Sequence, residues 1–263
     1  EDGTDIYFAR QLVNERIREA QARLPDGLQP NLLSIATGLG EIYMWTVESD
    51  PEASKADGTA YTPMDLREIQ DWIIKPQLRN VTGVTEINSI GGFAKEYQVA
   101  PSPEKLASYG LTLQDVVIAI DRNNSNVGAG YIEKRGEQYL IRAPGQVRSI
   151  EDIRNVILGN VQGVPIRIRD VADVGIGREL RTGAATDNGR EVVLGTVFML
   201  IGENSRTVSR AVDQKMVEIN RNLPEGIKAV TVYDRTVLVD KAINTVKKNL
   251  LEGAILVIVI LFL

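Results

Sequence analysis

The feature that most constrains this chain is a helix-to-strand unit that occurs twice. An amphipathic pattern runs from Asp5 to Leu24, with apolar residues three and four positions apart, and a Leu-Pro-Asp-Gly turn ends it ahead of a strand. A second amphipathic pattern, which begins near Val208, ends in the same way at Leu223-Pro-Glu-Gly226 and also leads into a strand. The second segment thus echoes the first, which indicates an internal repeat of the helix-to-strand unit.

Strands alternate with these helices over short connections. The predicted strands are Glu41–Val47, Val84–Ile90, Arg190–Leu200 and Lys228–Tyr233. Between the first two, Thr62 and Pro63 open a further helix, which we expect Pro76 to kink or end. Such alternation is typical of split βαβ units of the ferredoxin-like kind, in which helices cover one face of a small sheet. The sequence therefore predicts an α+β fold.

A β-rich insertion interrupts this alternation at roughly residues 126–187. Thr112 and Asp115, and again Ser149 and Asp152, have the spacing of a capping box, so we expect a helix to begin at each pair. Between and after these helices, short apolar runs punctuated by glycine predict several strands.

The last ten residues, Ala254 to Leu263, are all apolar. A membrane-spanning helix needs about 20 such residues, so we expect this run to be the first half of a membrane helix that the chain cuts short. Lys247 and Lys248 precede it, as basic residues often do at a membrane interface. A buried strand is the alternative, because Val and Ile favour strands.

Composition excludes several classes of function. The chain has no Cys and no His, which removes disulfides, thiolate metal sites, the usual zinc ligand and the Ser-His-Asp triad. It also lacks a P-loop, a dinucleotide-binding fingerprint and a nucleophile elbow, so an enzyme is the least expected class. The net charge of -5, with no basic stripe, gives no reason to expect nucleic acid as a partner.

Carboxylates at the strands are the candidate functional groups. Glu41 follows a Gly-Leu-Gly turn and shares one face of its strand with Tyr43 and Trp45. From the residues alone it is either an exposed edge charge, the more common case, or a group that lines a cleft. Glu86 has the same two interpretations, with less support. The four methionines are too scattered to form a copper or silver cluster: Met44, Met64, Met199 and Met216.

Several long stretches without gaps match a known pattern. They are Glu1–Arg16 (EDGTDIYFARQLVNER), Ala36–Trp45 (ATGLGEIYMW), Asp65–Tyr97, Gly136–Gly145 (GEQYLIRAPG), Val164–Gly177, Asn188–Arg206 and the segment from Val232 (VYDRT) onward. In these stretches, which extend over essentially the whole chain, the sequence resembles the large pump subunit of heavy-metal efflux systems in the resistance-nodulation-division superfamily, the cobalt-zinc-cadmium type.

The resemblance implies an architecture. Residues 1–37 would be the end of a first porter subdomain, 38–125 and 188–238 a second porter subdomain, 126–187 a docking subdomain inserted in it, and 239–263 the lead-in to a truncated transmembrane helix. Such pumps are homotrimers in the lipid of the bacterial inner membrane, and this segment would lie mostly in the periplasm. The implied partners are a periplasmic membrane-fusion adaptor and an outer-membrane channel.

The resemblance also implies an activity, the proton-driven export of divalent cations such as zinc, cobalt and cadmium, with no cofactor. Pumps of this type resemble the chain in having Glu after the Gly-x-Gly turn, so Glu41 is the expected metal-contacting carboxylate and Glu86 a second one. Oxygen ligands suit a transporter that must bind and release its ion. The alternatives are a resistance-nodulation-division exporter of copper and silver or of hydrophobic drugs, and a periplasmic binding module without transport.

Overall fold

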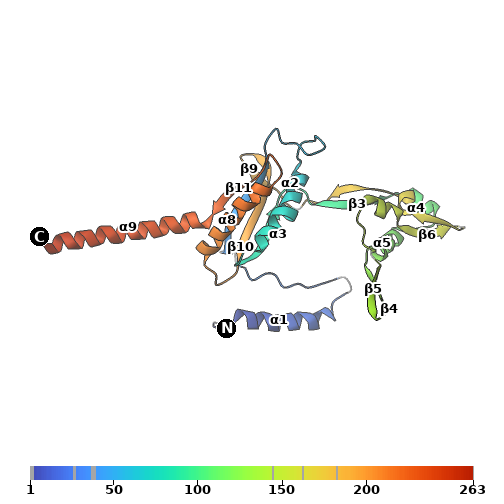
Figure 1. Cartoon of the computed structure of the whole chain (residues 1–263), viewed down its shortest axis with the longest axis horizontal. Helices are drawn as coiled ribbons and strands as arrows, with labels where there is room; N and C mark the ends of the chain where they lie inside the picture. The colour runs from blue at the N-terminus through green and yellow to red at the C-terminus, as the bar shows by residue number, and fades with distance from the viewer. Residues whose placement is uncertain are drawn as a thin grey trace. The chain divides into compact units, whose positions relative to one another are not determined.

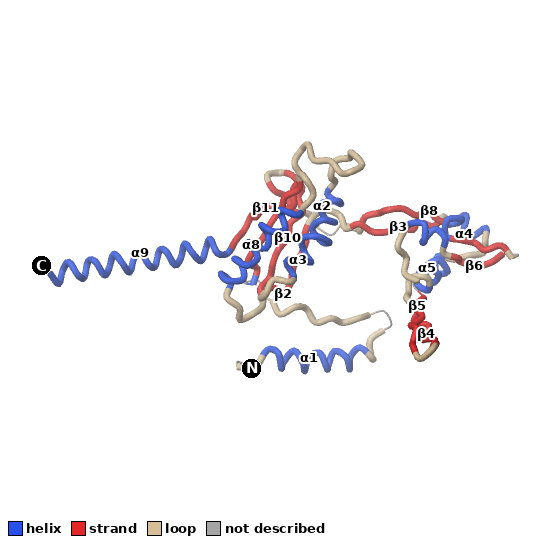
Figure 2. Tube along the Cα trace, viewed as in Figure 1, coloured by secondary structure: helices blue, strands red, loops and turns tan. Residues whose placement is uncertain are grey.

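The computed structural model describes residues 3–25, 28–36, 40–143, 145–161, 163–181 and 183–262. The chain forms two compact units. The first consists of Glu1–Ala53, Gln70–Ile90 and Leu194–Leu263, and the second of Ser54–Ile69 and Gly91–Val193. Both units combine helices with antiparallel strands (Figure 1 and Figure 2), so the predicted mixture of helix and sheet is confirmed.

The main sheet has five strands in the order β11-β1-β10-β2, with β9 also paired to β10. Their bounds are β1 Glu41–Ser49, β2 Val84–Ile90, β9 Ala185–Asp187, β10 Arg190–Met199 and β11 Ile227–Asp234. β1 pairs antiparallel with β11, and β10 pairs antiparallel with β2. The four strands predicted from the sequence are thus confirmed, and pairing brings together segments that lie far apart in the chain.

Helices cover one face of this sheet. The first is α8, Ser205–Asn222, which contacts β1. The second runs as the π-helical segment η2, Gln70–Ile74, then α3, Lys75–Arg79, and α3 contacts β2 and α8. It continues directly from α2, Pro63–Ile69, which belongs to the second unit. The predicted apolar face of α8 is buried at Val208, Val212, Met216 and Ile219. Burial of this face is the main force that holds the helix on the sheet.

The prediction that Pro76 ends its helix is wrong, and the other predicted outcome, a kink, stays a prediction. The helix continues to Arg79, and the five residues of η2 precede the proline instead. Proline lacks the N–H that an α-helix uses at that point, and its ring crowds the carbonyl one turn earlier. A π-turn changes the backbone pairing just before the proline and accommodates both effects.

Besides α2, β9 and the start of β10, the described residues of the second unit form three two-stranded sheets and four helices. The pairs are β3 Lys95–Pro101 with β8 Ala172–Arg178, β4 Val127–Lys134 with β5 Glu137–Ala143, and β6 Ile157–Val161 with β7 Val164–Arg167. The helices are α4 Pro103–Ser108, α5 Leu113–Arg122, α6 Ile150–Asn155 and α7 Ile168–Val171. Thr112 and Ser149 each form the predicted capping box, so the predicted starts of α5 and α6 are confirmed.

This unit begins earlier in the chain than the predicted insertion at residue 126. Leu106, Val116 and Ala119 of α4 and α5 share a buried cluster with Ile153 and Ile168. The reason is the pairing of β3 with β8, which holds residues 95–101 against 172–178. The subdomain names and boundaries implied by the resemblance stay predictions.

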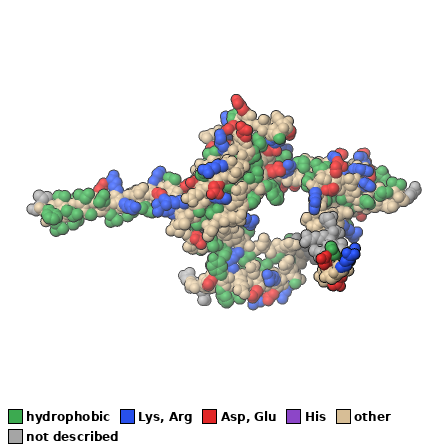
Figure 3. All heavy atoms as spheres, in the orientation of Figure 1, with side chains coloured by type: hydrophobic (Ala, Val, Ile, Leu, Met, Phe, Trp, Pro, Cys, Tyr) green, Lys and Arg blue, Asp and Glu red, His purple; other side chains and the backbone are tan. Residues whose placement is uncertain are grey.

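Two helices extend from the main sheet's unit. The first, α1, covers Ile6–Gln21 and has no buried residue. The second, α9, covers Arg235–Phe262 and follows β11 directly. The apolar run is therefore helical as far as Phe262, which rules out the strand alternative, and its side chains are exposed around the end of α9 (Figure 3). In the described part of the chain, no helix has the length and apolar character needed to cross a membrane.

Candidate functional site

Glu41 is the first residue of β1 and is half-buried. The preceding Gly40 lies against the end of β10, because a Cβ at this position would be 3.2 Å from the carbonyl oxygen of Met199. Side chains two positions apart share a face of a strand, so Glu41 lies on the same face as Tyr43. Residues 37–39, which include most of the predicted Gly-Leu-Gly turn, lie outside the described residues.

Glu86 lies in the middle of β2, opposite Phe198 of β10, and is also half-buried. Three residues further along β2, Ser89 accepts a hydrogen bond from Gln70 of η2 at 3.3 Å, so Ser89 faces the helices. An odd spacing along a strand puts side chains on opposite faces. Glu86 therefore lies on the face that the helices leave uncovered.

The two predicted carboxylates consequently do not converge. Tyr43 and Trp45, which share the face of Glu41, contact the helices, whereas Glu86 points to the other face, and β10 separates the two strands. Across the described residues, no group of three or more His, Cys, Asp or Glu could hold a metal ion. A divalent cation takes several oxygen ligands, so neither carboxylate alone would complete a metal site.

A polar network that the sequence did not predict lies beside Glu41 on the helix-covered face. The fully buried Tyr43 donates a hydrogen bond from its hydroxyl to Asp213 of α8 at 2.9 Å and lies 2.6 Å from the hydroxyl of Thr231. Burial raises the pKa of the Tyr43 phenol, and Asp213 raises it further. The phenol thus stays protonated and donating at neutral pH. No short motif links these residues, since Tyr43 and Thr231 are 188 positions apart.

A second carboxylate joins three elements of the same unit. Asp234, at the end of β11, accepts a hydrogen bond from Ser209 of α8 at 2.7 Å. It also accepts bonds from the backbone N–H and the hydroxyl of Thr236 in α9, both at 2.7 Å. Asp234 therefore ties the sheet, the covering helix and the first turn of α9 together.

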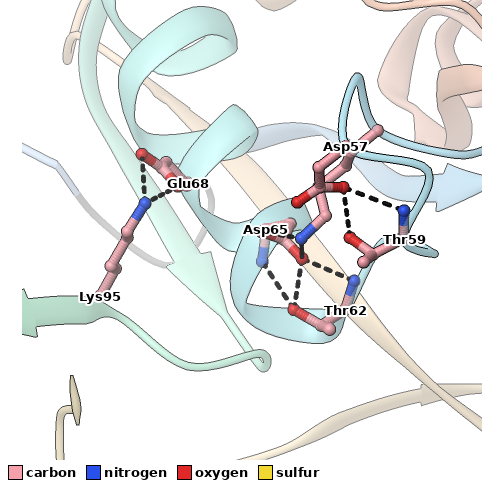
Figure 4. Close-up of polar contacts among 7 residues, drawn as sticks. Asp57, Thr59, Thr62, Asp65, Glu68 and Lys95 are labelled. Carbon is pink, nitrogen blue, oxygen red and sulfur yellow. Dashed lines mark hydrogen bonds and ion pairs between the residues drawn. The ribbon is translucent and has the colours of Figure 1, made fainter. Parts of the chain in front are cut away.

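Another cluster of acidic residues, in the second unit, has a structural role (Figure 4). Asp65 accepts hydrogen bonds from the N–H and hydroxyl of Thr62 at 2.8 and 2.5 Å and pairs with Lys55 at 3.1 Å. Partial burial works against ionisation of Asp65, but the bonds from Thr62 and the ion pair with Lys55 outweigh it, and the pKa of this carboxyl is lowered. Asp57 similarly accepts bonds from the N–H and hydroxyl of Thr59. These carboxylates accept hydrogen bonds from neighbouring residues of the chain, and in doing so they stabilise a turn and the start of a helix.

Fold and sequence together define the class of protein. The chain belongs to the AcrB/AcrD/AcrF family, which it matches over residues 1–263. Two crystal structures titled as a heavy metal efflux pump share this fold, with TM-scores of 0.80 and 0.81 at 30% and 29% sequence identity. The match covers 96% and 97% of this chain but 24% and 25% of those chains.

Curated relatives are more similar still. The chain is 75% identical over 262 residues to the cobalt-zinc-cadmium resistance protein CzcA of Cupriavidus metallidurans, and 61% identical to the protein HelA of Legionella pneumophila. It is 40% identical to the cation efflux system protein CusA of Escherichia coli K12. These matches confirm the resemblance predicted from the sequence. The chain spans about a quarter of the length of CzcA and HelA, 25% in each case.

Proposed function

We propose that the complete protein exports divalent heavy-metal cations, namely zinc, cobalt and cadmium, across the cell envelope. The observation that carries this proposal is the identity of 75% with a cobalt-zinc-cadmium resistance protein over the whole chain. Similarity to CusA, at 40%, is much lower, which favours divalent ions over the alternative of copper and silver. An exporter of hydrophobic drugs is disfavoured because only four phenylalanines are present to line an aromatic pocket.

Within that protein, we propose that residues 38–125 and 188–238 form a ferredoxin-like porter subdomain. Support comes from the order β11-β1-β10-β2, in which two strand-helix-strand units interleave, with helices on one face. Residues 126–187 would be the inserted docking subdomain, residues 1–37 the end of another porter subdomain, and residues 239–263 the lead-in to a transmembrane helix. The ten apolar residues from Ala254 support the last assignment.

Export of this kind needs an energy source and partners. We propose a homotrimer in the bacterial inner membrane, driven by protons, that works with a periplasmic adaptor and an outer-membrane channel. Membership of the AcrB/AcrD/AcrF family supports this assignment. This chain would be mostly periplasmic and would supply neither the proton relay nor a resident cofactor.

We further propose that Glu41 contacts the transported ion, with Glu86 as a second contact. The position of Glu41 at the first residue of β1, half-buried beside the polar network of Tyr43, suits a carboxylate that binds an ion reversibly. Since Glu86 lies on the opposite face, the two would contact the ion at different points of its path, each together with ligands from the rest of the protein.

Metal accumulation in sensitive bacteria that carry the complete gene and its partner genes tests this function. Wild type is compared with Glu41→Gln and Glu86→Gln at matched protein levels. Glu48→Gln is the matched control, because Glu48 lies in the same strand and accepts a hydrogen bond from Thr46 of that strand. We expect wild type and the control to lower zinc, cobalt and cadmium, and Glu41→Gln to lose about tenfold in export, the scale seen when groups that support a metal site are removed.

The other outcomes separate the parts of the proposal. If Glu41→Gln exports as well as Glu48→Gln does, the carboxylate is an edge charge and the site assignment is wrong. If wild type lowers none of the three ions but lowers copper or silver, the divalent assignment is wrong and the alternative substrate class takes its place.

A further inference from the structure

One carboxylate joins α8 to α9 through two arginines. Asp240 of α9 lies 2.6 Å from the Nε atom of Arg206 and 3.1 Å from the Nη2 atom of Arg210, both in α8. Arg206 and Arg210 are four residues apart and therefore lie on the same side of the helix, one turn from each other. We call these three residues the α8–α9 clamp.

The inner contact of the clamp is shielded from water. The side chains are partly exposed, but the Nε atom of Arg206 and the Oδ1 atom of Asp240 are themselves inaccessible to solvent. Loss of water opposes ionisation of Asp240, yet the two guanidinium groups outweigh it and the pKa of this carboxyl is lowered. The three side chains are otherwise 35–53% exposed, so water screens part of the attraction. The clamp differs from the other ion pairs of α8 because one carboxylate of α9 meets two guanidinium groups of another helix.

The clamp lies where α9 leaves the rest of its unit. Asp234 and Thr236 hold the first turn, and Asp240 follows Thr236 after about 6 Å of helix. Ile243 is partly covered, and every side chain from Asn244 to Phe262 is exposed. The helix is thus attached at two points on one short stretch. Two attachments fix the direction of the α9 axis, whereas a single attachment would let the helix rotate about it.

Other ion pairs of α8 do not have this arrangement. Lys215 and Glu218 pair at 2.7 Å, three residues apart within the helix, and the Glu218 side chain is 60% exposed. That pair supports α8 and reaches no other element. Only the clamp pairs reach from α8 to α9, among the described ion pairs of that helix.

We propose that the clamp couples α9 to the sheet during transport, with Asp240 as the positioning residue. A continuous helix that is fixed at two points passes any tilt to the element that holds it, here α8, which covers the strand of Glu41. Asp240 acts through the arginines and does not contact the metal. This inference rests on the proposed export function, because it assigns the clamp a part in that cycle.

Two measurements on the complete pump test the coupling. The first is metal export by Asp240→Asn, by Arg206→Gln/Arg210→Gln and by the triple variant, with Glu218→Gln as the matched control. We expect Asp240→Asn to lower the export rate about threefold or more, with metal affinity and protein level unchanged. The export rate of the triple variant should fall no further than that of the more impaired of the other two variants. The reason is that all three variants remove the same interaction, the one between Asp240 and the two arginines.

The second measurement does not depend on export. Spin labels on cysteines introduced at Arg221 of α8 and Lys247 of α9, both exposed, report the distance between the helices. The chain has no cysteine of its own, and cysteines elsewhere in the pump are replaced. We expect one narrow distance distribution in the wild type and a clearly broader one in Asp240→Asn, with Glu218→Gln like the wild type.

Either measurement can overturn the proposal. An Asp240→Asn pump that exports at the wild-type rate refutes coupling, and so does a metal affinity that falls in parallel with export, since Asp240 would then belong to the binding site. If the wild type exports no metal, the proposed function fails, but the distance measurement still tests the clamp. An Asp240→Asn distribution like that of the wild type refutes the clamp, and a broader one supports it.

Discussion

A single glycine shows how closely the interior of the main sheet is filled. A Cβ on Gly195 of β10 would lie 2.2 Å from the ring of Trp45 and 2.6 Å from the amide nitrogen of Gln70. The indole of Trp45 donates a hydrogen bond to Gln70 at 2.9 Å, and the hydroxyl of Ser89 donates one to Asp71 at 2.6 Å. Gln70 is fully buried, so its amide needs these partners. The missing side chain at Gly195 makes room for the whole arrangement.

We therefore expect Gly195→Ala to lower the free energy of unfolding of the 263-residue chain by about 1–3 kcal/mol, the usual cost of overpacking. Urea unfolding followed by circular dichroism measures this. The control is Gly175→Ala, also in a strand, where a Cβ meets nothing within 4 Å and we expect a change within about 0.5 kcal/mol. Equal effects at both positions would show that the close contact at Trp45 relaxes without cost.

At the scale of elements, short helices of the second unit depend on their ends. α5 has ten residues and begins with Thr112, whose hydroxyl accepts a hydrogen bond from the N–H of Asp115 at 3.3 Å. Asp115 in turn accepts bonds from the N–H and hydroxyl of Thr112 at 2.8 and 2.7 Å. These bonds keep the pKa of the Asp115 carboxyl low. Helices of this length are marginal on their own, so the cap and the buried Val116 together hold α5 in place.

Thr112→Ala should destabilise α5 by about 1 kcal/mol, because it leaves an N–H of the first turn without its partner. Hydrogen exchange of the α5 amides, measured by mass spectrometry, should accelerate accordingly. Ser108→Ala serves as the control, since Ser108 is exposed in the last turn of α4 and donates only to Lys105 of that helix. Unchanged exchange in α5 after Thr112→Ala would mean that packing alone defines where the helix begins.

At the scale of the whole molecule, the chain has two separate cores. Ile219 of α8 belongs to the first and Ile168 of α7 to the second, and neither side chain is exposed to solvent. The chain passes from one unit to the other four times, after Ala53, Ile69, Ile90 and Val193. Units with their own cores commonly open separately.

Ile219→Ala and Ile168→Ala make a matched pair that tests this division. Each should cost about 2–5 kcal/mol, because each leaves a cavity in a filled core. We expect hydrogen exchange to accelerate in the strands β1, β2, β10 and β11 for Ile219→Ala, and in β6, β7 and β8 for Ile168→Ala. If either variant accelerates exchange in both sets equally, the chain unfolds as one cooperative unit.

The sequence by itself determined the local features. Capping boxes at Thr112 and Ser149, the buried face of α8 and the four strands of the main sheet follow from signals that act within a few residues, and all were predicted. The resemblance of long segments identified the class of protein and selected Glu41 and Glu86 as candidates.

Only the tertiary structure decided which of these features meet. The grouping of residues 54–69 with residues 91–193 in the second unit and the clamp at Asp240 have no local signal. The pairing order and register place Tyr43 beside Thr231 and put Glu41 and Glu86 on opposite faces of the sheet. The physical reason is that a strand's local sequence sets its alternation, whereas its neighbours are selected by burial and hydrogen bonding summed over the whole sheet.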